Sequence, residues 1–209
     1  MQMQKHQAEK GGSAAITVQS AEGQHIDFLE VVVSQESENT GVAVSGSVKS
    51  YSPQVETTVT LLREGDLVDT VIIALAAGSG QVEQAFTFED VAPGTYDLDF
   101  QEAGHTRYTL KNVVVSEAPL SLTKDPRASI KQITLLCGDN NDDGVINVTD
   151  LNIVWSAANY NKSADAATNS SADLNGDGVI NVTDLNILWS AANYNKGAVV
   201  FDYREDIPE

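Results

Sequence analysis

The pattern of apolar and polar positions divides the chain into two parts. From residue 14 to residue 136, short β-branched or alternating runs, such as 26–33 and 58–62, are separated by polar breaks. The clearest stretch is 86–100, where apolar residues alternate on both sides of Pro93 and Gly94, a pair that suits a type II turn. Short strands with turns at this spacing predict an antiparallel β-sandwich over residues 14–136.

The periodicity becomes helical after Gly138. Two stretches, 149–160 and 183–194, have the spacing of short helices, and a small polar connector, 163–171, separates them. The pattern therefore predicts a second, small all-α domain over residues 137–209. Residues 1–13 are polar and contain two glycines, which predicts a disordered tail or a cloning remnant.

The helical part contains an internal repeat. Seventeen of the eighteen residues of 145–162 recur in 179–196, and only Val154 and Leu188 differ. A repeat this close makes one surface twice. Each copy follows an acidic, glycine-bearing loop, at 139–144 in the first copy and at 173–178 in the second.

Both loops have the ligand pattern of a calcium site. Calcium takes about six to eight oxygen ligands, and a loop of about twelve residues supplies them from alternating positions around a sharp turn at glycine. The sequence therefore predicts two bound Ca²⁺ ions. Their ligands are Asp139, Asn141, Asp143, the carbonyl of Val145, Asn147 and Asp150 in the first loop, and Asp173, Asn175, Asp177, the carbonyl of Val179, Asn181 and Asp184 in the second. The alternative, acidic turns that only cap the helices, explains the last ligand of each loop but not the earlier ones.

A loop followed by one helix, duplicated and with Asp as its last ligand, resembles a dockerin. The resemblance is carried by GDNNDDGVINVTDL at 138–151 and ADLNGDGVINVTDL at 172–185. It implies two antiparallel EF-hand-like loop–helix motifs that dock on a cohesin of a scaffoldin or cell-surface protein. It also implies a secreted bacterial protein in an extracellular, cellulosome-type assembly for polysaccharide degradation. An ordinary EF-hand differs, since a helix precedes its loop and its last ligand is Glu.

The first part of the chain resembles the prealbumin-like or carboxypeptidase-regulatory sandwich modules of secreted bacterial proteins. The similarity rests on VSGSV at 44–48, FEDVAPGTYDLDF at 88–100 and the Ala-Gly-His at 103–105. Because ITLLCGD runs directly into the first loop, the whole chain also resembles the X-module–dockerin tandems of anaerobic gut bacteria. This resemblance implies that the sandwich is a structural companion of the dockerin. The alternative, a carbohydrate-binding strip of aromatic residues, is disfavoured because these residues alternate as core residues do.

The helical stretches have two faces when plotted at about 100° per residue. Leu151, Val154 and Ala158 cluster as a core side, while a continuous arc without Lys or Glu lies on another side. By the resemblance, this arc contacts the cohesin, and its apolar character implies a distinct cohesin class. The two copies of the arc are Val148, Thr149, Asn152, Trp155, Ser156, Asn159 and Tyr160, and Val182, Thr183, Asn186, Trp189, Ser190, Asn193 and Tyr194. Two equal arcs imply that one cohesin binds in either of two orientations. The alternative is that both tryptophans pack in the domain's own core.

Composition argues against several other functions. The formal net charge of −18 disfavours a nucleic-acid partner, since binding phosphates requires clustered Lys and Arg. The single Cys137 excludes an internal disulfide, and the longest apolar run, 71–77, is too short for a membrane helix. The N-terminal residues lack the apolar stretch of a signal peptide.

The ionisable residues do not indicate catalysis. The three histidines, at 6, 25 and 105, are scattered without a nucleophile or metal arrangement, so the chain is predicted not to be an enzyme. The alternative function is a calcium-binding structural or buffering module without a cohesin partner. A calcium sensor would need a Met-rich surface, whereas methionine occurs only at positions 1 and 3.

Overall fold

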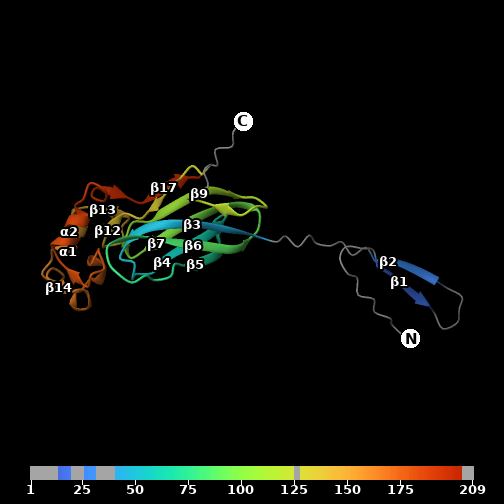
Figure 1. The fold of residues 1–209 in the computed structure, drawn as a ribbon, viewed down its shortest axis with the longest axis horizontal. Helices are drawn as coiled ribbons and strands as arrows, with labels where there is room; N and C mark the ends of the chain where they lie inside the picture. The colour runs from blue at the N-terminus through green and yellow to red at the C-terminus, as the bar shows by residue number, and fades with distance from the viewer. Residues whose placement is uncertain (1–13, 20–25, 32–40, 125–127, 204–209) are drawn as a thin grey trace. The chain divides into compact units, whose positions relative to one another are not determined.

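The chain divides into two compact units, residues 1–40 and 41–209. The structure is a computed structural model that describes residues 14–19, 26–31, 41–124 and 128–203. In the first unit, β1 (Ala14–Gln19) and β2 (Ile26–Val31) pair with each other in an antiparallel sheet (Figure 1). The sandwich therefore starts at Val42 and not at residue 14, as the sequence had predicted. The tail predicted over 1–13 lies outside the described residues.

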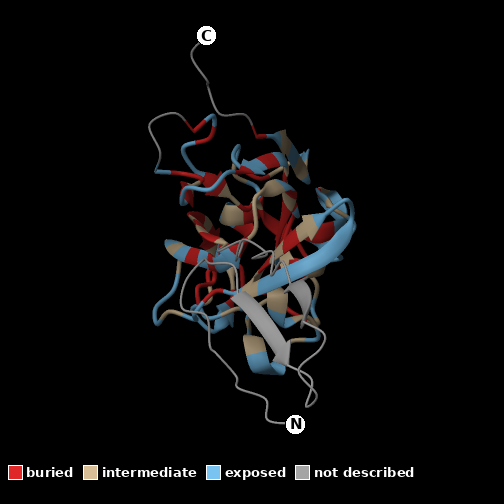
Figure 2. Cartoon of the chain, turned by 90° about the vertical axis from the view of Figure 1, so that its right-hand side faces the viewer, coloured by how far each residue is buried: buried red, intermediate tan, exposed pale blue. Residues whose placement is uncertain are grey.

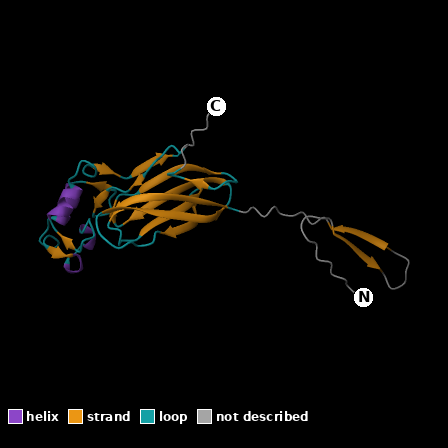
Figure 3. Cartoon of the chain, viewed as in Figure 1, coloured by secondary structure: helices purple, strands orange, loops and turns teal. Residues whose placement is uncertain are grey.

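In the described part of the second unit, the two larger sheets form a sandwich around its own apolar core (Figures 1 and 3). The smaller sheet consists of β10 (Leu120–Ser121), β3 (Val42–Tyr51), β11 (Ile133–Thr134) and β6 (Gln81–Val91). The larger sheet has the order β17 (Val199–Asp202), β9 (Tyr108–Val115), β7 (Gly94–Glu102), β4 (Thr57–Arg63) and β5 (Asp66–Ile72).

Three strand pairs are parallel, so the prediction of a purely antiparallel sandwich was wrong. β10 and β11 both run parallel to β3, with Leu120 opposite Val44 and Ile133 opposite Val48. β17 runs parallel to β9. All three strands return to a sheet after a long connection, which is the connection that parallel neighbours require.

Buried residues gather between the two sheets (Figure 2), and along β3 and β4 they alternate with less buried ones. Phe86 contacts Phe88 and Phe100 edge to face, with ring centroids 6.2 and 5.3 Å apart. All three rings are buried, and so is Tyr96. The aromatic residues that alternate along 86–100 are therefore core residues and not a carbohydrate-binding strip.

The repeat forms two short helices linked by cross-paired strands. The helices are α1 (Val148–Val154) and α2 (Val182–Leu188). Beside the first loop, β13 (Val145–Ile146) pairs with β16 (Lys196–Gly197), which follows α2. Conversely, β14 (Lys162–Ser163), which follows α1, pairs with β15 (Val179–Ile180) of the second loop. Because of these pairs the domain is not all-α, and each repeat is completed by a strand of the other.

Both helices are shorter than predicted. α1 ends at Val154, with Trp155 as its C-cap, and does not continue to residue 160. The Ser156 hydroxyl and the Asn159 amide each donate to the Ile153 carbonyl at 2.8 Å. Side chains thereby satisfy a carbonyl at the end of the helix, where the regular hydrogen-bond ladder leaves such groups without partners.

Residues 199–203 return to the sandwich, although the sequence had assigned the whole of 137–209 to the helical domain. β17 lies beside β9, with Val199 opposite Tyr108 and Phe201 opposite Leu110. Tyr203 is buried in the sandwich core. β-branched and aromatic residues favour a strand at the edge of the larger sheet. No helix in the described residues is long and apolar enough to cross a membrane.

A short strand pair joins the sandwich to the first loop. β12 (Cys137–Asp139) is antiparallel to β8 (Gly104–His105), with Cys137 opposite His105. The helical domain has its own small core, which Tyr51 of β3 also contacts. The buried members of that core are Cys137, Ile146, Val154, Ala172, Leu174, Ile180, Leu185 and Leu188.

We expect the sandwich and the helical domain to tumble as one body, because strand pairing and packing join them without a linker. Measurements of ¹⁵N relaxation should give one rotational correlation time for residues 41–203. Separate correlation times for 42–134 and 139–196 would contradict this expectation.

Candidate functional site

The first acidic loop folds its backbone around its own carboxylates. Asp139 accepts hydrogen bonds from the backbone N–H groups of Asp143 and Gly144, at 3.1 and 2.9 Å. Asp143 accepts one from the N–H of Val145 at 2.9 Å. Gly144 has a φ of +83°, which favours glycine at this turn. Three predicted calcium ligands therefore lie on one tight turn.

The second loop repeats this pattern. Asp173 accepts from the N–H groups of Asp177 and Gly178, at 3.2 and 2.8 Å. Asp177 accepts from the N–H of Val179 at 3.0 Å. The loops therefore have one conformation around the predicted ligands, although they differ in sequence at Asn140 and Asp142.

The last two predicted ligands of each loop also begin the following helix. Asn147 is the N-cap of α1 and forms a capping box with Asp150. The two carboxylate oxygens of Asp150 accept from the N–H groups of Asn140 and Asn147, at 2.8 and 2.9 Å. Asn181 and Asp184 make the same capping box in α2. Helix capping thus occurs, as the alternative interpretation required, and it also brings the end of the loop back to its start.

The loops gather negative charge without a protein cation. Burial raises the pKa of Asp139 above its usual range, and the carboxylates of Asp150 and Asp143 add to this rise against opposing backbone N–H groups. Burial also raises the pKa of Asp173 and Asp184. In the described part of the chain, Arg107 pairs with Asp99 and Lys111 with Asp97, both within the sandwich, and no Lys or Arg forms an ion pair with the aspartates of either loop. Clustered, partly desolvated carboxylates of this kind are stabilised by a bound cation.

The oxygen-rich ligand set fits a hard cation such as calcium. In the described part of the chain, no group of three or more His, Cys, Asp or Glu side chains is gathered closely enough to hold a metal by itself. Each predicted set, however, combines three carboxylates with two Asn side chains and one backbone carbonyl. The oxygen donors that these residues carry are therefore of the kind that calcium prefers.

Two aromatic pairs stand on the surface after the helices. The rings of Trp155 and Tyr160 have centroids 4.7 Å apart, and those of Trp189 and Tyr194 are 4.6 Å apart. Trp155 is 60% exposed and Trp189 is 58% exposed. The alternative in which both tryptophans pack in the core was therefore wrong, while Val154 and Leu188 are fully buried, as predicted.

The structure leaves most of each predicted arc accessible. The well-exposed members are Val148, Thr149, Asn152 and Trp155, and Val182, Thr183, Asn186 and Trp189. Ser156, Tyr160, Ser190 and Tyr194 are partly buried. Each loop–helix motif therefore presents an apolar, uncharged surface around its tryptophan.

Asn159 and Asn193 do not belong to this surface. Asn159 is 3% exposed, and its side chain joins the Ile153 carbonyl to the N–H of Asn169, which donates at 2.9 Å. Asn193 is 4% exposed and donates to the Ile187 carbonyl at 2.8 Å. The helical plot placed both on the arc because it assumed that the helices continue to residues 160 and 194.

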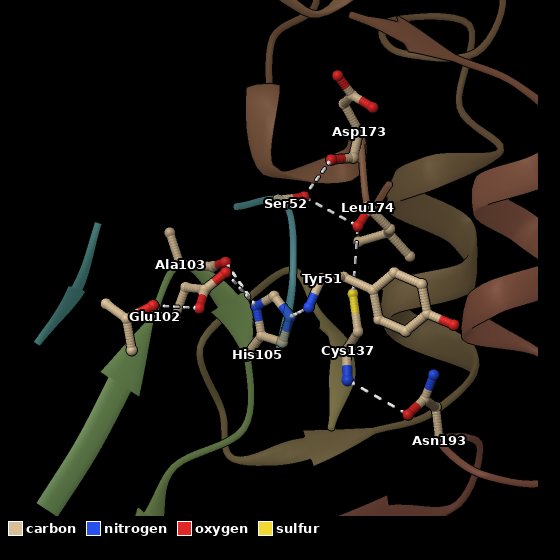
Figure 4. Close-up of polar contacts among 10 residues, drawn as sticks. Tyr51, Ser52, Glu102, Ala103, His105, Cys137, Asp173, Leu174 and Asn193 are labelled. Atoms are coloured by element: carbon tan, nitrogen blue, oxygen red, sulfur yellow. Dashed lines mark hydrogen bonds and ion pairs between the residues drawn. The ribbon is translucent and has the colours of Figure 1, made fainter. Parts of the chain in front are cut away.

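Polar groups also line the junction between the sandwich and the first loop. Burial lowers the pKa of His105 to about 4, so the ring is neutral at pH 7. Its Nε2 accepts from the N–H of Tyr51 at 3.2 Å, so Nδ1 donates to the Ala103 carbonyl at 3.1 Å (Figure 4). His105 is thus neutral and buried, and both of its ring nitrogens are hydrogen-bonded at the junction.

Comparison with known proteins identifies the C-terminal domain. Residues 137–191 match the family model of the dockerin type I domain, so these residues form a dockerin domain. A search of the curated proteins gives no match.

Two solved structures are similar to the larger part of the chain. An N-terminal interface mutant of the type II cohesin–X-dockerin complex from Acetivibrio cellulolyticus is 25% identical, with a TM-score of 0.55. A C-terminal interface mutant of that complex is 22% identical, also with a TM-score of 0.55, and shows the fold alone. Each comparison covers 75% of this chain and 97% of the other. This chain is therefore an X-module-like sandwich followed by a dockerin domain.

The buried asparagines can be tested against an exposed one. Asn159→Ala should destabilise the dockerin domain by about 1–3 kcal/mol, because the Ile153 carbonyl and the Asn169 N–H lose a buried partner. The matched control is Asn152→Ala, an exposed site on the same repeat, which should change stability by less than about 0.5 kcal/mol. Denaturant unfolding measures both, and equal effects would show that Asn159 is not structural.

Proposed function

We propose that this chain is a calcium-dependent assembly module that docks its parent protein onto a cohesin. The observation that carries the proposal is the pair of exposed Trp–Tyr surfaces on a dockerin domain. Large exposed aromatic side chains are typical of protein-binding hot spots. The similar structures are described as cohesin–X-dockerin complexes, which supports the same class of partner here.

Two Ca²⁺ ions complete the site in this proposal. The loops supply the oxygen ligands predicted from the sequence, and their aspartates lack a protein cation. Bound calcium would supply the positive charge that draws the two ends of each loop together. Asp150 and Asp184 then act twice, as last ligands and as helix caps, so ion binding and helix formation stabilise each other.

Two binding orientations form the second part of the proposal. The arcs have the same sequence, and their tryptophans have nearly equal exposure. The cross-pairing of β13 with β16 and of β14 with β15 is consistent with two motifs that exchange roles. A cohesin that binds one arc should therefore also bind the other, after a rotation of about 180° that exchanges the two motifs.

An extracellular assembly is the setting that fits these parts. Docking onto a cohesin of a scaffoldin or cell-surface protein gives the chain no need for catalysis. The alternative is a calcium-binding structural or buffering module without a cohesin. That alternative gives the two exposed tryptophans no role. Keeping a large apolar side chain in water is unfavourable, and exposed apolar surface of this kind is typical of a binding site. A pull-down against a panel of cohesins, with and without chelator, separates the two.

Chelation should unfold the dockerin domain and spare the sandwich. The dockerin core is small and its loops carry most of its charge, so calcium binding supplies much of its folding energy. Calorimetry should show two ions per chain, and excess chelator should abolish only the transition of residues 138–196. Asp143→Ala and Asp177→Ala should each lose one ion. A stoichiometry other than two, or no change with chelator, contradicts the calcium sites.

Cohesin binding should tolerate the loss of either arc but not of both. With two equal modes, Trp155→Ala with Tyr160→Ala removes one mode and costs a factor of about two, or about 0.4 kcal/mol. Adding Trp189→Ala and Tyr194→Ala should cost at least about 2–4 kcal/mol. Titration calorimetry against one cohesin measures the three affinities. A large loss from either half alone would indicate one interface that spans both arcs, and the melting temperature of each variant controls for misfolding.

A further inference from the structure

The sandwich contacts the two calcium loops unequally. Four consecutive carbonyl groups at the start of the second loop accept hydrogen bonds from a turn after β3 and from a residue before β6. Two of these bonds run from Ser52 Oγ to the carbonyls of Asp173 at 3.3 Å and Leu174 at 2.9 Å (Figure 4). The other two run from Gly80 N to Asn175 at 2.6 Å and from Gln54 Nε2 to Gly176 at 3.3 Å. We refer to Ser52, Gln54 and Gly80 as the clamp.

The first loop meets the sandwich at its start and, at its turn, through the Gly144 carbonyl, which accepts from the N–H of Ala198 just before β17 at 2.9 Å. Asp139 pairs with Gly104, and the Asn140 carbonyl accepts from Asn169 within the dockerin domain at 2.9 Å. Beyond this point a cavity of about 380 Å³ lies between the first loop and the sandwich, lined on the sandwich side by Gln101 and Arg107 among others. Among the described residues, the carbonyls of 139–142, which correspond to the clamped ones, therefore accept no side-chain hydrogen bond from the sandwich.

The sequence differences between the loops follow this contact. Over 139–150 and 173–184 the repeats differ only at Asn140, which is Leu174 in the second loop, and at Asp142, which is Gly176. Leu174 is 2% exposed and belongs to the dockerin core. A Cβ atom on Gly176 would lie 3.1 Å from the Cα of Ser52, which is tighter than ordinary packing. The second loop thus has glycine, without a side chain, where the clamp lies against it. The corresponding residue of the first loop, Asp142, has an exposed side chain.

The clamp is itself held in an unusual conformation. Ser52 has a φ of +57°, although it is not glycine, and it is only 4% exposed. A left-handed residue of this kind persists where surrounding contacts compensate its conformational cost. Here the compensating contacts include the two carbonyls of the second loop that the hydroxyl bridges.

We propose that the clamp positions the second calcium loop, so that calcium binding there and docking of the sandwich stabilise each other. The inference rests on the proposed calcium binding. The ligands Asp173 and Asn175 belong to the clamped segment, and a loop held in its bound conformation loses less conformational freedom when the ion binds. By linkage, an ion in the second loop must then strengthen the sandwich contact by the same factor. The first loop, which faces the cavity, binds its ion independently of the clamp.

The test measures each loop alone in the full chain. Asp143→Ala leaves only the second loop to bind calcium, and Asp177→Ala leaves only the first. Ser52→Ala, added to each, should weaken calcium binding about threefold to tenfold in the Asp143→Ala chain, the range for one lost buried hydrogen bond. It should leave the affinity of the Asp177→Ala chain unchanged. Gln101→Ala, which faces the first loop across the cavity, is the matched control and should change neither affinity.

A second measurement reads the contact without altering the clamp. The Gly80 amide donates to the Asn175 carbonyl, so its hydrogen exchange reports whether the sandwich holds the second loop. In the presence of calcium, Asp177→Ala should accelerate this exchange about tenfold or more, whereas Asp143→Ala should leave it slow.

The outcomes distinguish this inference from the proposed function. If the unmodified chain binds no calcium, the proposed function fails. If calcium binds but Ser52→Ala weakens both loops equally or neither, the clamp is overturned. Equal acceleration of Gly80 exchange in both Asp variants also overturns it, even if Ser52→Ala fails to fold.

Discussion

The pairing of β12 with β8 is the contact on which the arrangement of the two domains depends. Cys137 and Asp139 belong both to a strand beside the sandwich and to the start of the first loop. The change from one core to the other occurs between adjacent residues, since Leu135 is buried in the sandwich and Leu136 packs against the dockerin core. A chain that changes cores within one peptide bond leaves no room for a flexible linker. The orientation of the loops is therefore set by the sandwich.

The dockerin domain places buried carboxylates at the start of its two short helices. Asp150 and Asp184 are fully buried in the first turn of helices of only about two turns, and each accepts hydrogen bonds from backbone N–H groups. Such short helices are marginal without tertiary support. Tight turns organised around carboxylates provide that support only if the negative charge is balanced. This requirement links the fold of the domain to the cation that we propose for it.

The duplication makes the two loop–helix motifs alike, whereas the sandwich makes their surroundings different. The repeat provides two aromatic surfaces of the same sequence, which are the basis of the two binding orientations that we propose. The sandwich lies against the second loop but leaves a cavity beside the first, which makes the surroundings of the two motifs unequal. For a partner that contacts only an arc, the two orientations should be equivalent. For a partner that also contacts the sandwich, they should differ. The area that the cohesin covers thus decides whether the two orientations are equivalent.

The sequence by itself determined the loops, the repeat and the aromatic surface, because each depends on residues a few positions apart. The ligand spacing and the glycine at 144 are local requirements, and the alternation along 86–100 identified the sandwich core. Only the tertiary structure decided the parallel strands, the return of β17 to the sandwich and the end of each helix. The strand pairings and the contact of Ser52 with Leu174 depend on partners distant in sequence, and the helix ends depend on side-chain bonds such as that from Asn159 to the Ile153 carbonyl. Hydrogen bonds of this kind leave no periodic pattern along the chain, and they form only when the fold brings their partners together.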